Sequence, residues 1–588
     1  MEWLISGDDN LNGVVLVRYR KKTEGEGQWL DGMPLRRVPA GSSVGTSPIF
    51  SWKNKHSGSI FALEPATTYE IALSLSDPDG GIAEKTLTAT TRAVPAAASD
   101  GVVKQVSPET YTSVVYAADP GDILELSAGY YGNAFTTRNG EPGRPIVIRP
   151  DSLSTDSGSV IFDRFSLSYR KHVILQGVTV NGKVDLFGAE EVAVIGCTVN
   201  APYGIVASES PGATNCYIAD NVLSYTVTWE ESSLGVDGDN YGEGIQLTGP
   251  GNVICYNRVT GYRDCISTME DNEVYNQMCI DIYNNDIYTG VDDAVEADFC
   301  MGNCRVYNNR ITNCFMGVSS QPGLGGPTYI MRNVMYNIIN CPFKLSRGSK
   351  GDVLLHNTIV KVGTGFYIVH DPTYVYSRNN LAIGGIGDGI FGKWESGQAR
   401  AMDFARADGT ADFDYDGLGT HGAPFAAKIG GLGGDFLYLS LSDLQANSTE
   451  KHAVEVDMNV FDTDVEWPSP PFPGREPANL RLASGSAAED AGLVIPNIND
   501  GFSGTAPDLG AYEIGAPLPH YGPRPAGGIV GCDFNADGQI NITDVIALIL
   551  YQRAYPDDLG GDFNRDGSVD LTDAITLLLT IMRESCPS

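Results

Sequence analysis

The fragments ICYNRV (254–259), IYNNDI (282–287), RVYNNRI (305–311), IMRNVM (330–335) and LLHNTI (354–359) repeat one pattern. In each, an asparagine follows a short apolar run and precedes another apolar residue. The asparagines in this phase are Asn221, Asn257, Asn285, Asn309, Asn333, Asn357 and Asn379. Their intervals are 36, 28, 24, 24, 24 and 22 residues. A period near 24 with strand-like pieces predicts a solenoid of stacked β-coils.

The repeated asparagine itself is interpreted as structural. Asparagine tolerates the left-handed backbone conformation and can form hydrogen bonds along a stack of coils. Gly177 and Gly196 are predicted to take the same position in the earlier coils. The repeat therefore predicts a fold and carries no information about a reaction.

Length and composition limit the classes of protein. A chain of 588 residues is too long for one ordinary core, so several domains are expected. A net charge of −34, from 39 basic and 73 acidic residues, argues against nucleic acid and anionic membranes as partners. The sequence has no run of 18 apolar residues, so no membrane span is predicted. Of the 11 cysteines, nine lie between Cys197 and Cys341 and are interpreted as core residues.

The first 95 residues are predicted to form a separate module. VVLVRYRKKTEGEGQW (14–29) and LEPATTYEIALSLSDPDGG (63–81) alternate as strands do. They resemble a fibronectin type III domain, a small β-sandwich. The chain begins inside a strand-like run, EWLISGDD (2–9), and no signal peptide follows Met1, so a truncated or processed N-terminus is expected.

Residues 96–400 are predicted to form the solenoid itself. YAADPGDILELSAGYYG (116–132) resembles the entry coil of right-handed parallel β-helix polysaccharide lyases and their relatives. LRLASGSAAEDAG (480–492) and GTAPDLGAYEIG (504–515) resemble the C-terminal end of many bacterial β-helix proteins, so 401–515 is interpreted as closing coils and cap. A Pro/Gly linker spans 516–529. The expected fold class is mainly β: a right-handed parallel β-helix with an N-terminal β-sandwich and a small C-terminal α-helical calcium-binding module.

Aligning the second half of each coil predicts columns of side chains. The apolar residues that set the inward phase are Ile245, Ile266, Val295, Val318, Phe343 and Phe366. Coils stack about 4.8 Å apart, which places Glu243, Asp264 and Asp293 on three neighbouring coils. The other acidic residues beside them are Asp292, Glu296 and Asp298. Carboxylates so close repel unless a cation or a base offsets the charge, which favours a functional site over solvated turn residues.

The longest loops lie next to these carboxylates. The insertion YTVTWEESSLGVDGDNYGE (225–243) supplies Trp229 and Tyr241, whose flat rings suit sugar rings. On the other side, FKLSRGSKGD (343–352) supplies Lys344, Arg347 and Lys350, which suit an anionic glycan or act as salt-bridge partners.

Three functions remain open on the sequence. Hydrolysis of a glycosidic bond needs two carboxyl groups. The segments EGI, RDCI and DDAV resemble the Asp-rich turns of β-helix polygalacturonases, which implies Glu243, Asp264, Asp292 and Asp293 as catalytic candidates. The His-Gly and Arg-x-Lys motifs of that family are absent downstream. A non-catalytic β-helix that binds glycan or protein is the third possibility.

Elimination at a uronate is the second possibility. Calcium-dependent β-helix pectate lyases place an Asp on one coil, Asp-Asp-x-x-Asp on the next and a Lys base beyond. That resemblance implies Asp264, Asp292, Asp293 and Glu296 as calcium ligands and Lys344 as the base. Glu replaces the last Asp, and Lys344 is predicted to lie two coils, about 10 Å, from Glu296.

The tail, 530–588, carries two loops of one type, DFNADGQINITD (533–544) and DFNRDGSVDLTD (562–573). Each loop offers oxygen ligands at positions 1, 3, 5, 7 and 12 and a glycine at position 6. The predicted ligands of two Ca²⁺ ions are Asp533, Asn535, Asp537, Gln539, Asp544, Asp562, Asn564, Asp566, Ser568 and Asp573. Apolar helical segments follow both loops.

The duplicated loop–helix resembles a type I dockerin, which implies a scaffold protein bearing cohesins as partner. A calcium-stabilised end cap without a partner is the alternative. Catalytic subunits with dockerins mostly degrade polysaccharides. The sequence is therefore interpreted as a secreted polysaccharide-degrading enzyme, with glycoside hydrolase as the first hypothesis and polysaccharide lyase as the second.

Overall fold

The structure is a computed structural model. It describes residues 1–524 apart from 23–26, 152–158, 209, 269–276, 369, 388, 408–409 and 432–433. Beyond residue 524 it describes seven residues, all helical: Val545, Ile546, Leu548, Ile549, Ala574, Ile575 and Leu578. The predicted calcium ligands of the tail lie outside the described residues. Among the described helices, none has the length and apolar character needed to cross a membrane.

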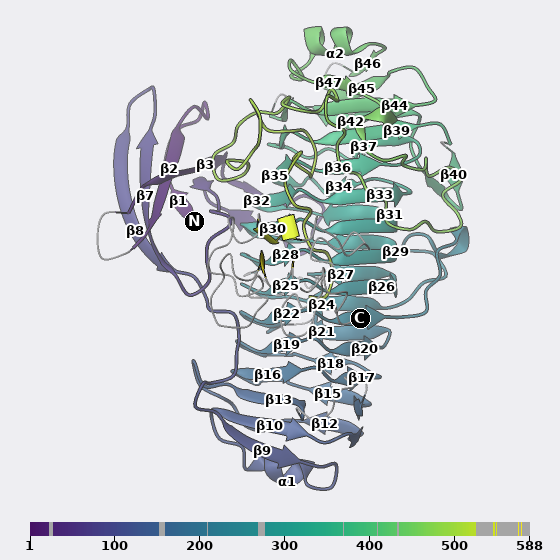
Figure 1. Cartoon of the computed structure of the whole chain (residues 1–588). Helices are drawn as coiled ribbons and strands as arrows, with labels where there is room; N and C mark the ends of the chain where they lie inside the picture. Colours follow the sequence, from purple (N-terminus) through teal and green to yellow (C-terminus); the bar gives the residue numbers. More distant parts are fainter. Residues whose placement is uncertain are drawn as a thin grey trace.

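The centre of the molecule is a parallel β-helix (Figure 1). Its first sheet contains thirteen described strands that pair in parallel from coil to coil. They are β9 (Val102–Val106), β10 (Asp122–Leu126), β13 (Ile146–Pro150), β16 (Val173–Gln176), β19 (Ala193–Ile195), β22 (Tyr217–Ala219), β25 (Val253–Cys255), β28 (Asp281–Tyr283), β30 (Cys304–Tyr307), β32 (Leu324–Met331), β35 (Lys350–Leu355), β38 (Tyr376–Arg378) and β43 (Asp412–Asp414).

The other two faces form one large sheet with two rows of strands, because β29 and β31 run through both rows. The second row contains β11 (Gly129–Tyr130), β14 (Val160–Phe162), β17 (Thr179–Val180), β20 (Thr198–Asn200), β23 (Val222–Ser224), β26 (Arg258–Tyr262), β29 (Asp286–Glu296), β31 (Arg310–Ser320), β33 (Val334–Ile338), β36 (Thr358–Val360), β39 (Leu381–Gly385), β44 (Gly417–His421) and β47 (Val454–Val456).

The third row carries the predicted site. It contains β12 (Asn133–Phe135), β15 (Arg164–Ser166), β18 (Val184–Asp185), β21 (Tyr203–Ala207), β24 (Glu243–Leu247), β27 (Asp264–Ser267), the second halves of β29 and β31, and β34 (Phe343–Leu345). A four-stranded sheet continues beyond it with β37 (Thr364–Ile368), β42 (Arg400–Ala407), β45 (Ala427–Gly431) and β46 (Gly434–Tyr438). A two-stranded ribbon, β40 (Ile390–Phe391) with β41 (Trp394–Glu395), lies in a loop at the side.

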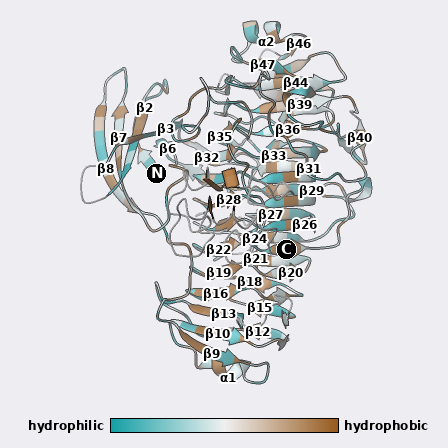
Figure 2. Cartoon of the chain, in the orientation of Figure 1, coloured by the Kyte–Doolittle hydropathy of each residue, from teal (hydrophilic) through white to brown (hydrophobic). Residues whose placement is uncertain are grey.

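The predicted inward phase is confirmed by the strand register. Ile245 pairs with Ile266, Ile266 with Val295, Val295 with Val318, and Val318 with Phe343. All five side chains are fully buried in the core. Figure 2 shows the apolar residues concentrated on the strands of the coils.

The asparagine ladder is confirmed as a chain of hydrogen bonds, with one correction. In each coil the asparagine Oδ1 accepts from the backbone N and Nδ2 of the asparagine one coil earlier, from Asn221 to Asn357. The next member is Asn380, whose Oδ1 accepts from the N of Asn357 at 2.9 Å. Asn379 was the wrong choice, because it takes the left-handed position, with φ +62°, one residue earlier.

The prediction that Gly177 and Gly196 take the ladder position is wrong for the same reason. Gly177 and Gly196 have φ of +69° and +63° and take the left-handed position, whereas the ladder position follows one residue later. The ladder asparagines themselves are absent from the left-handed residues. In this fold the left-handed conformation and the hydrogen-bonded side chain thus belong to neighbouring residues.

Short helices cover both ends of the described β-helix (Figure 1). α1 (Tyr111–Tyr116) buries Tyr111 and Val115 at the first coil, and α2 (Leu441–Asn447) buries Leu444 at the last. Two 3₁₀ turns, η2 (Glu231–Ser233) and η3 (Met458–Val460), lie in loops. Residues 457–524, here called the flank segment, run back over the side of the coils and hydrogen-bond to the turns there.

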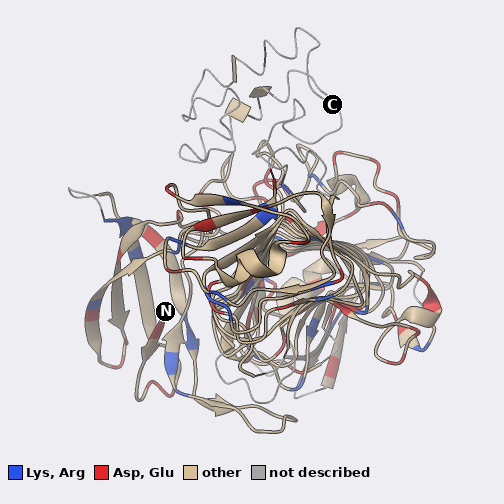
Figure 3. Cartoon of the chain, turned by 90° about the horizontal axis from the view of Figure 1, so that it is seen from below, with Lys and Arg blue, Asp and Glu red and all other residues tan. Residues whose placement is uncertain are grey.

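The N-terminal region packs beside the first sheet. Its strands β1 (Glu2–Leu4), β6 (Lys55–Ser57), β3 (Leu30–Val38), β2 (Val14–Lys21), β7 (Thr68–Ser76) and β8 (Ile82–Thr90) form one antiparallel sheet in that order. β4 (Gly41–Ser42) pairs with β5 (Ser51–Trp52). A second full sheet is not among the described strands of this region, so the fibronectin type III β-sandwich stays a prediction. Basic and acidic residues are interspersed along its strands and loops (Figure 3).

Most of the cysteines are core residues, as expected. Cys197, Cys216, Cys255, Cys265, Cys314 and Cys341 are buried free thiols. Cys300 and Cys304 are also buried in the core and form a disulfide, and Cys279, which is exposed, is the exception among the described cysteines.

Candidate carboxylate site

The predicted acidic residues gather on the third row of the β-helix, in the middle of its length (Figure 1). The register places Glu243 of β24 opposite Asp264 of β27, and Asp293 of β29 opposite Met316. Successive side chains of a strand point to opposite faces, so Glu296, next to the buried Val295, turns outward. The buried isoleucines and valines also fix the strand register, which brings Glu243 and Asp264, the first residues of β24 and β27, into one column. The apolar pattern of the coils therefore positions the carboxylates.

Two groups of carboxylates are close enough to share a ligand. One oxygen each from Glu243, Asp264 and Glu296 lie within 4.8 Å of one another, and so do one each from Asp264, Asp292 and Asp293. Asp264 belongs to both groups. Its Oδ1 accepts a hydrogen bond from the backbone N of Asp293 at 2.8 Å, which fixes its orientation.

Lys344 joins the cluster from two coils away. Glu296 pairs with Ser319, and Ser319 with Lys344, as the sequence predicted. The ammonium nevertheless reaches back to Asp293, with 2.6 Å between Nζ and Oδ2. The long side chain of Lys344 passes over the short Ser319. The ammonium group therefore contacts a carboxylate, although the two coils are expected to lie about 10 Å apart.

Arg263 belongs to the site and was missed in the sequence. Its Nε lies 3.4 Å from Asp264 Oδ2 and 3.5 Å from Asp292 Oδ2, and its side chain is 37% exposed. The signal was present in the segment RDCI, where the arginine directly precedes an acidic residue. Arg263 lies one position before the first predicted column, which contains Asp264, and therefore fell outside the predicted columns.

Asp298 lies deeper than the other carboxylates. It is fully buried, and its Oδ1 accepts from Ser319 Oγ at 2.6 Å and from the backbone N of Gln321 at 2.8 Å. The structure therefore places Asp298 beneath the cluster, where it can influence Lys344 and has no contact with solvent.

Burial and crowding shift the proton equilibria of the cluster. Burial raises the pKa of Glu243 and of Asp264 well above the usual range, and the neighbouring carboxylates add to this. Burial and the charge of Asp293 raise the pKa of Asp292 to about 6. Burial lowers the pKa of Lys344, but the carboxylates Asp293, Asp298 and Asp292 outweigh burial and raise it overall. Without a cation, the site is thus a partly protonated set of acids around an ammonium group.

The predicted sugar-binding residues lie in different surroundings. Tyr241 is 53% exposed beside Glu243 and packs edge to face on Tyr203, with 5.3 Å between ring centroids. The ring of Trp229 contacts Phe472 of the flank segment, and its Nε1 donates to Pro471 O at 3.0 Å. Arg347 is exposed in a left-handed turn. Tyr241 is therefore placed to meet a ligand at the cluster, whereas Trp229 forms part of the wall.

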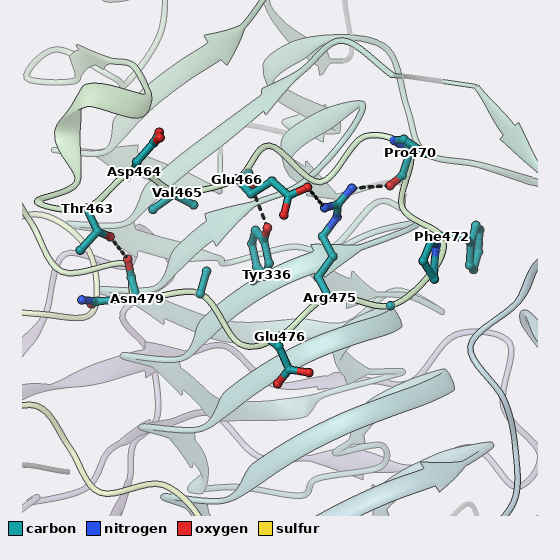
Figure 4. Close-up of a pocket in the computed structure, with 13 residues that line it drawn as sticks. Tyr336, Thr463, Asp464, Val465, Glu466, Pro470, Phe472, Arg475, Glu476 and Asn479 are labelled. Carbon is teal, nitrogen blue, oxygen red and sulfur yellow. Dashed lines mark hydrogen bonds and ion pairs between the residues drawn. The ribbon is translucent and has the colours of Figure 1, made fainter. Parts of the chain in front are cut away.

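A cavity lies elsewhere, beside the flank segment. It has a volume of about 540 Å³ and opens between Tyr336 of β33 and residues 463–479 of the flank segment. In Figure 4 Arg475 bridges Glu466 and Pro470 across it. None of the predicted site residues that the structure describes lines this cavity, and the carboxylate cluster lies on a different row of strands.

Comparisons with known proteins were made for the whole chain. No protein-family model and no curated protein matches it. Among solved structures, the chain is similar to a PL6 family polysaccharide lyase from Pseudopedobacter saltans. The sequences are 10% identical, the match covers 65% of this chain and 98% of that chain, and the TM-score is 0.31. These values leave the function to be argued from the carboxylate cluster.

Proposed function

We propose that the chain is a polysaccharide lyase that eliminates at a uronate with the help of a divalent cation. The observation that supports this most is the contact between Lys344 Nζ and Asp293 Oδ2, beside three carboxylates whose oxygens lie within 4.8 Å. Elimination needs a cation to neutralise the substrate carboxylate and a base to take the C5 proton. Asp293 is common to both requirements, because it belongs to a carboxylate group that could hold the cation and it contacts Lys344, the proposed base.

The donor set fits a hard cation such as Ca²⁺. Asp264, Asp292 and Asp293 offer only carboxylate oxygens, which calcium prefers. Within the described part of the chain, Asp293 Oδ1 is buried and has no hydrogen-bond partner, whereas Oδ2 accepts from Lys344. Asp293 thus has one oxygen for a cation and one for the lysine.

Lys344 is the group proposed to move the proton. A cation bound at the aspartates would neutralise the uronate carboxylate and make the C5 proton more acidic. Lys344 must then be neutral to accept this proton at Nζ, and the carboxylates around it hold it as an ammonium group. Any positive charge added to the cluster opposes that effect, so base strength and cation binding are coupled. Arg263, which is partly exposed, is placed to hold the anionic substrate.

The test is product analysis with uronate polymers and neutral polysaccharides. Elimination leaves an unsaturated sugar that absorbs ultraviolet light, whereas hydrolysis yields new reducing ends without that absorbance. We expect ultraviolet-absorbing products that disappear with a chelator. Lys344→Ala should lose at least about 100-fold in kcat, because general-base catalysis contributes roughly 10²–10⁴-fold. Lys350→Ala is the matched control. It changes a lysine of β35, on the first sheet, whose ammonium lies over the ring of Trp52. Full activity of Lys344→Ala would contradict the proposal.

Hydrolysis by paired carboxylates is the second candidate, and one observation favours it. Glu243 has a raised pKa, as a general acid requires, and one of its oxygens lies within 4.8 Å of an oxygen of Glu296. Against it, Glu243, Asp264 and Asp293 are almost fully buried, and Glu296 is the partly exposed carboxylate of the two groups. Reducing ends without ultraviolet absorbance would establish this alternative. Retention of glycan without either product would favour a binding protein.

We further propose that the tail docks the enzyme to a cohesin-bearing scaffold through two calcium loops, as a secreted protein. The loops at 533–544 and 562–573 support this, together with the helical conformation of residues such as Val545, Leu548 and Ala574 after them. Calcium titration should show two sites that Asp544→Asn and Asp573→Asn weaken one by one, since position 12 supplies a ligand. Unchanged titration in both variants would contradict the assignment.

A further inference from the structure

We propose that the carboxylate cluster binds two divalent cations that share Asp264 as a bridging ligand. The group of Asp264, Asp292 and Asp293 is the cation site of the proposed function, and the second site is the group of Glu243, Asp264 and Glu296. In both groups the oxygens lie within 4.8 Å of one another, and Asp264 is their common member. A carboxylate has two oxygens and can bridge two ions, as in two-metal sites with ions about 3.5–4 Å apart.

Buried oxygens without partners support the second site independently. Glu243 is 8% exposed, and its Oε2 is buried without a hydrogen-bond partner among the described residues. This residue contributes to the second group only. Asp293 Oδ1 is the corresponding orphan of the first group. Leaving a buried acceptor without a partner is unfavourable, and one cation in each group would satisfy one of these oxygens.

The charges of the cluster, when all its carboxyl groups are ionised, also favour more than one ion. Glu243, Asp264, Asp292, Asp293, Glu296 and Asp298 carry six negative charges when ionised, and Arg263 and Lys344 supply two positive ones. The balance is −4, so one divalent cation leaves −2 and two leave zero. A buried site favours neutrality, because an uncompensated charge there is costly.

The two sites differ in access to a substrate. Glu296 is partly exposed, whereas Asp264 and Asp293 are 2% and 1% exposed. The second group also adjoins Tyr241, through Glu243. The outer cation is therefore inferred to take the carboxylate of an acidic sugar and the inner cation to act near Lys344. This division of roles rests on the proposed function, whereas the bridged pair does not.

Manganese provides a direct test, since Mn²⁺ accepts oxygen ligands and has unpaired spins. Full-length protein loaded with Mn²⁺ should give the electron paramagnetic resonance spectrum of an exchange-coupled pair. Glu243→Gln should bind one ion fewer and give uncoupled Mn²⁺ at the remaining site. Asp264→Asn should lose the coupled signal. Asp403→Asn, which changes an acidic residue on β42 outside the cluster, should leave it unchanged.

The outcomes separate this inference from the proposed function. Only uncoupled Mn²⁺ in the wild-type protein would overturn the bridged pair, even if a lyase activity is found. A coupled signal without any ultraviolet-absorbing product would support the pair and contradict the lyase. A coupled signal that survives Asp264→Asn would arise outside the cluster and would overturn the assignment. The calcium loops of the tail, which none of these variants changes, serve as an internal check on Mn²⁺ loading. Circular dichroism of each variant confirms that the fold is retained.

Discussion

Two neighbouring residues in each coil have different roles. One takes the left-handed conformation, as Asn308 does with φ +53°, and the next extends a buried side chain along the stack, as Asn309 does. Asn309 Oδ1 accepts from Asn285, and its Nδ2 donates to Ile282 O and to Asn333. Glycine can take the left-handed conformation of the first residue, but it has no side chain to form the hydrogen bonds of the second.

Substitutions at these two positions should therefore differ. Asn309→Ala removes the side-chain partner of the backbone N of Asn285 and of the carbonyl of Ile282, which should lower the free energy of unfolding by roughly 2–4 kcal/mol. Asn308→Gly should stay within about 0.5 kcal/mol of wild type, because glycine suits a left-handed backbone. Chemical denaturation of both variants measures the difference. Equal losses would show that the side chain of Asn309 carries no special role.

The ladder ends in a pair of acids. Asn380 donates to Asp416, and Asp416 adjoins Glu450, with both acidic residues fully buried. Burial raises the pKa of Asp416 to about 6 and that of Glu450 well above its usual range. The folded chain thus keeps protons that the unfolded chain releases, and stability is present at low pH and falls as the pH rises from about 4 through 6.

Replacing one of the two acids tests the direction in which stability changes with pH. Glu450→Gln keeps the shape and a hydrogen-bond donor without the ionisable group. It should match wild type at pH 4 and be more stable by on the order of 2 kcal/mol at pH 8, since one pKa unit corresponds to about 1.4 kcal/mol. Thermal unfolding across this range measures it. Glu455→Gln, at an exposed position of β47, is the control and should change nothing. A variant less stable than wild type at pH 8 would contradict the argument.

The columns could be predicted from the sequence, and the contacts between columns could not. Apolar residues fix the register, so the stacking of Glu296, Ser319 and Lys344 followed from periodicity alone. The bond from Lys344 to Asp293 depends on the reach of a long side chain over a serine. Arg263 depends on which way an arginine turns at a strand end. Neither the Lys344–Asp293 contact nor the orientation of Arg263 follows a repeat in the sequence, so periodicity could not predict them.

At the level of elements, the wall beside the site is built from three loops. Trp394 packs on Phe315, with 5.1 Å between ring centroids, and its Nε1 donates to Leu234 O at 2.9 Å. Phe472 of the flank segment joins this apolar cluster. The backbone N of Gly235 in turn donates to Val291 O, one residue before Asp292. The insertion at 225–243 is thereby tied to the strand that carries the carboxylates.

Removing the central ring should loosen that wall. Trp394→Ala should cost about 2–4 kcal/mol, because it opens a cavity and leaves Leu234 O without its donor. Hydrogen exchange in residues 225–242 should become faster, and activity should fall because the strand beside Asp292 loses support. Mass spectrometry of exchanged peptides resolves this region. Phe436→Ala removes a half-exposed ring of β46 and should leave these peptides unchanged. Unaltered exchange at 225–242 in Trp394→Ala would show that the loop is held by other contacts.

Across the whole molecule, the flank segment connects parts that are distant in sequence. Asn497 Nδ2 donates to Tyr19 OH and Phe61 O of the N-terminal sheet. His356, in a turn of the β-helix, donates from Nδ1 to Gly510 O at 3.0 Å, so its Nε2 accepts from Nδ2 of Asn379 and of Asn499. Burial lowers the pKa of His356 well below the usual range. The segment lacks any repeat that would have marked this path in the sequence.

The predicted linker is partly docked, and this gives the last test. Arg524 Nε and Nη2 contact the carboxylate of Asp220 at 2.9 and 2.7 Å, and its guanidinium lies 4.1 Å from the centre of the Tyr256 ring. Asp220→Asn removes the charge at a left-handed position that asparagine tolerates. Because the pair is partly exposed, the free energy of unfolding should change by less than about 1 kcal/mol.

Local opening should nevertheless be visible. Exchange of residues 516–524 should accelerate in Asp220→Asn, since a bidentate contact that holds the end of the segment is lost. Asp237→Asn breaks an exposed ion pair with Lys393 elsewhere on the surface and should leave 516–524 unchanged. If exchange at 516–524 stays at the wild-type rate in Asp220→Asn, the hydrogen bond from Gly522 N to Asn284 O and the packing of Tyr521 suffice to hold it. The point where the tail leaves the β-helix would then be fixed by the backbone and not by charge.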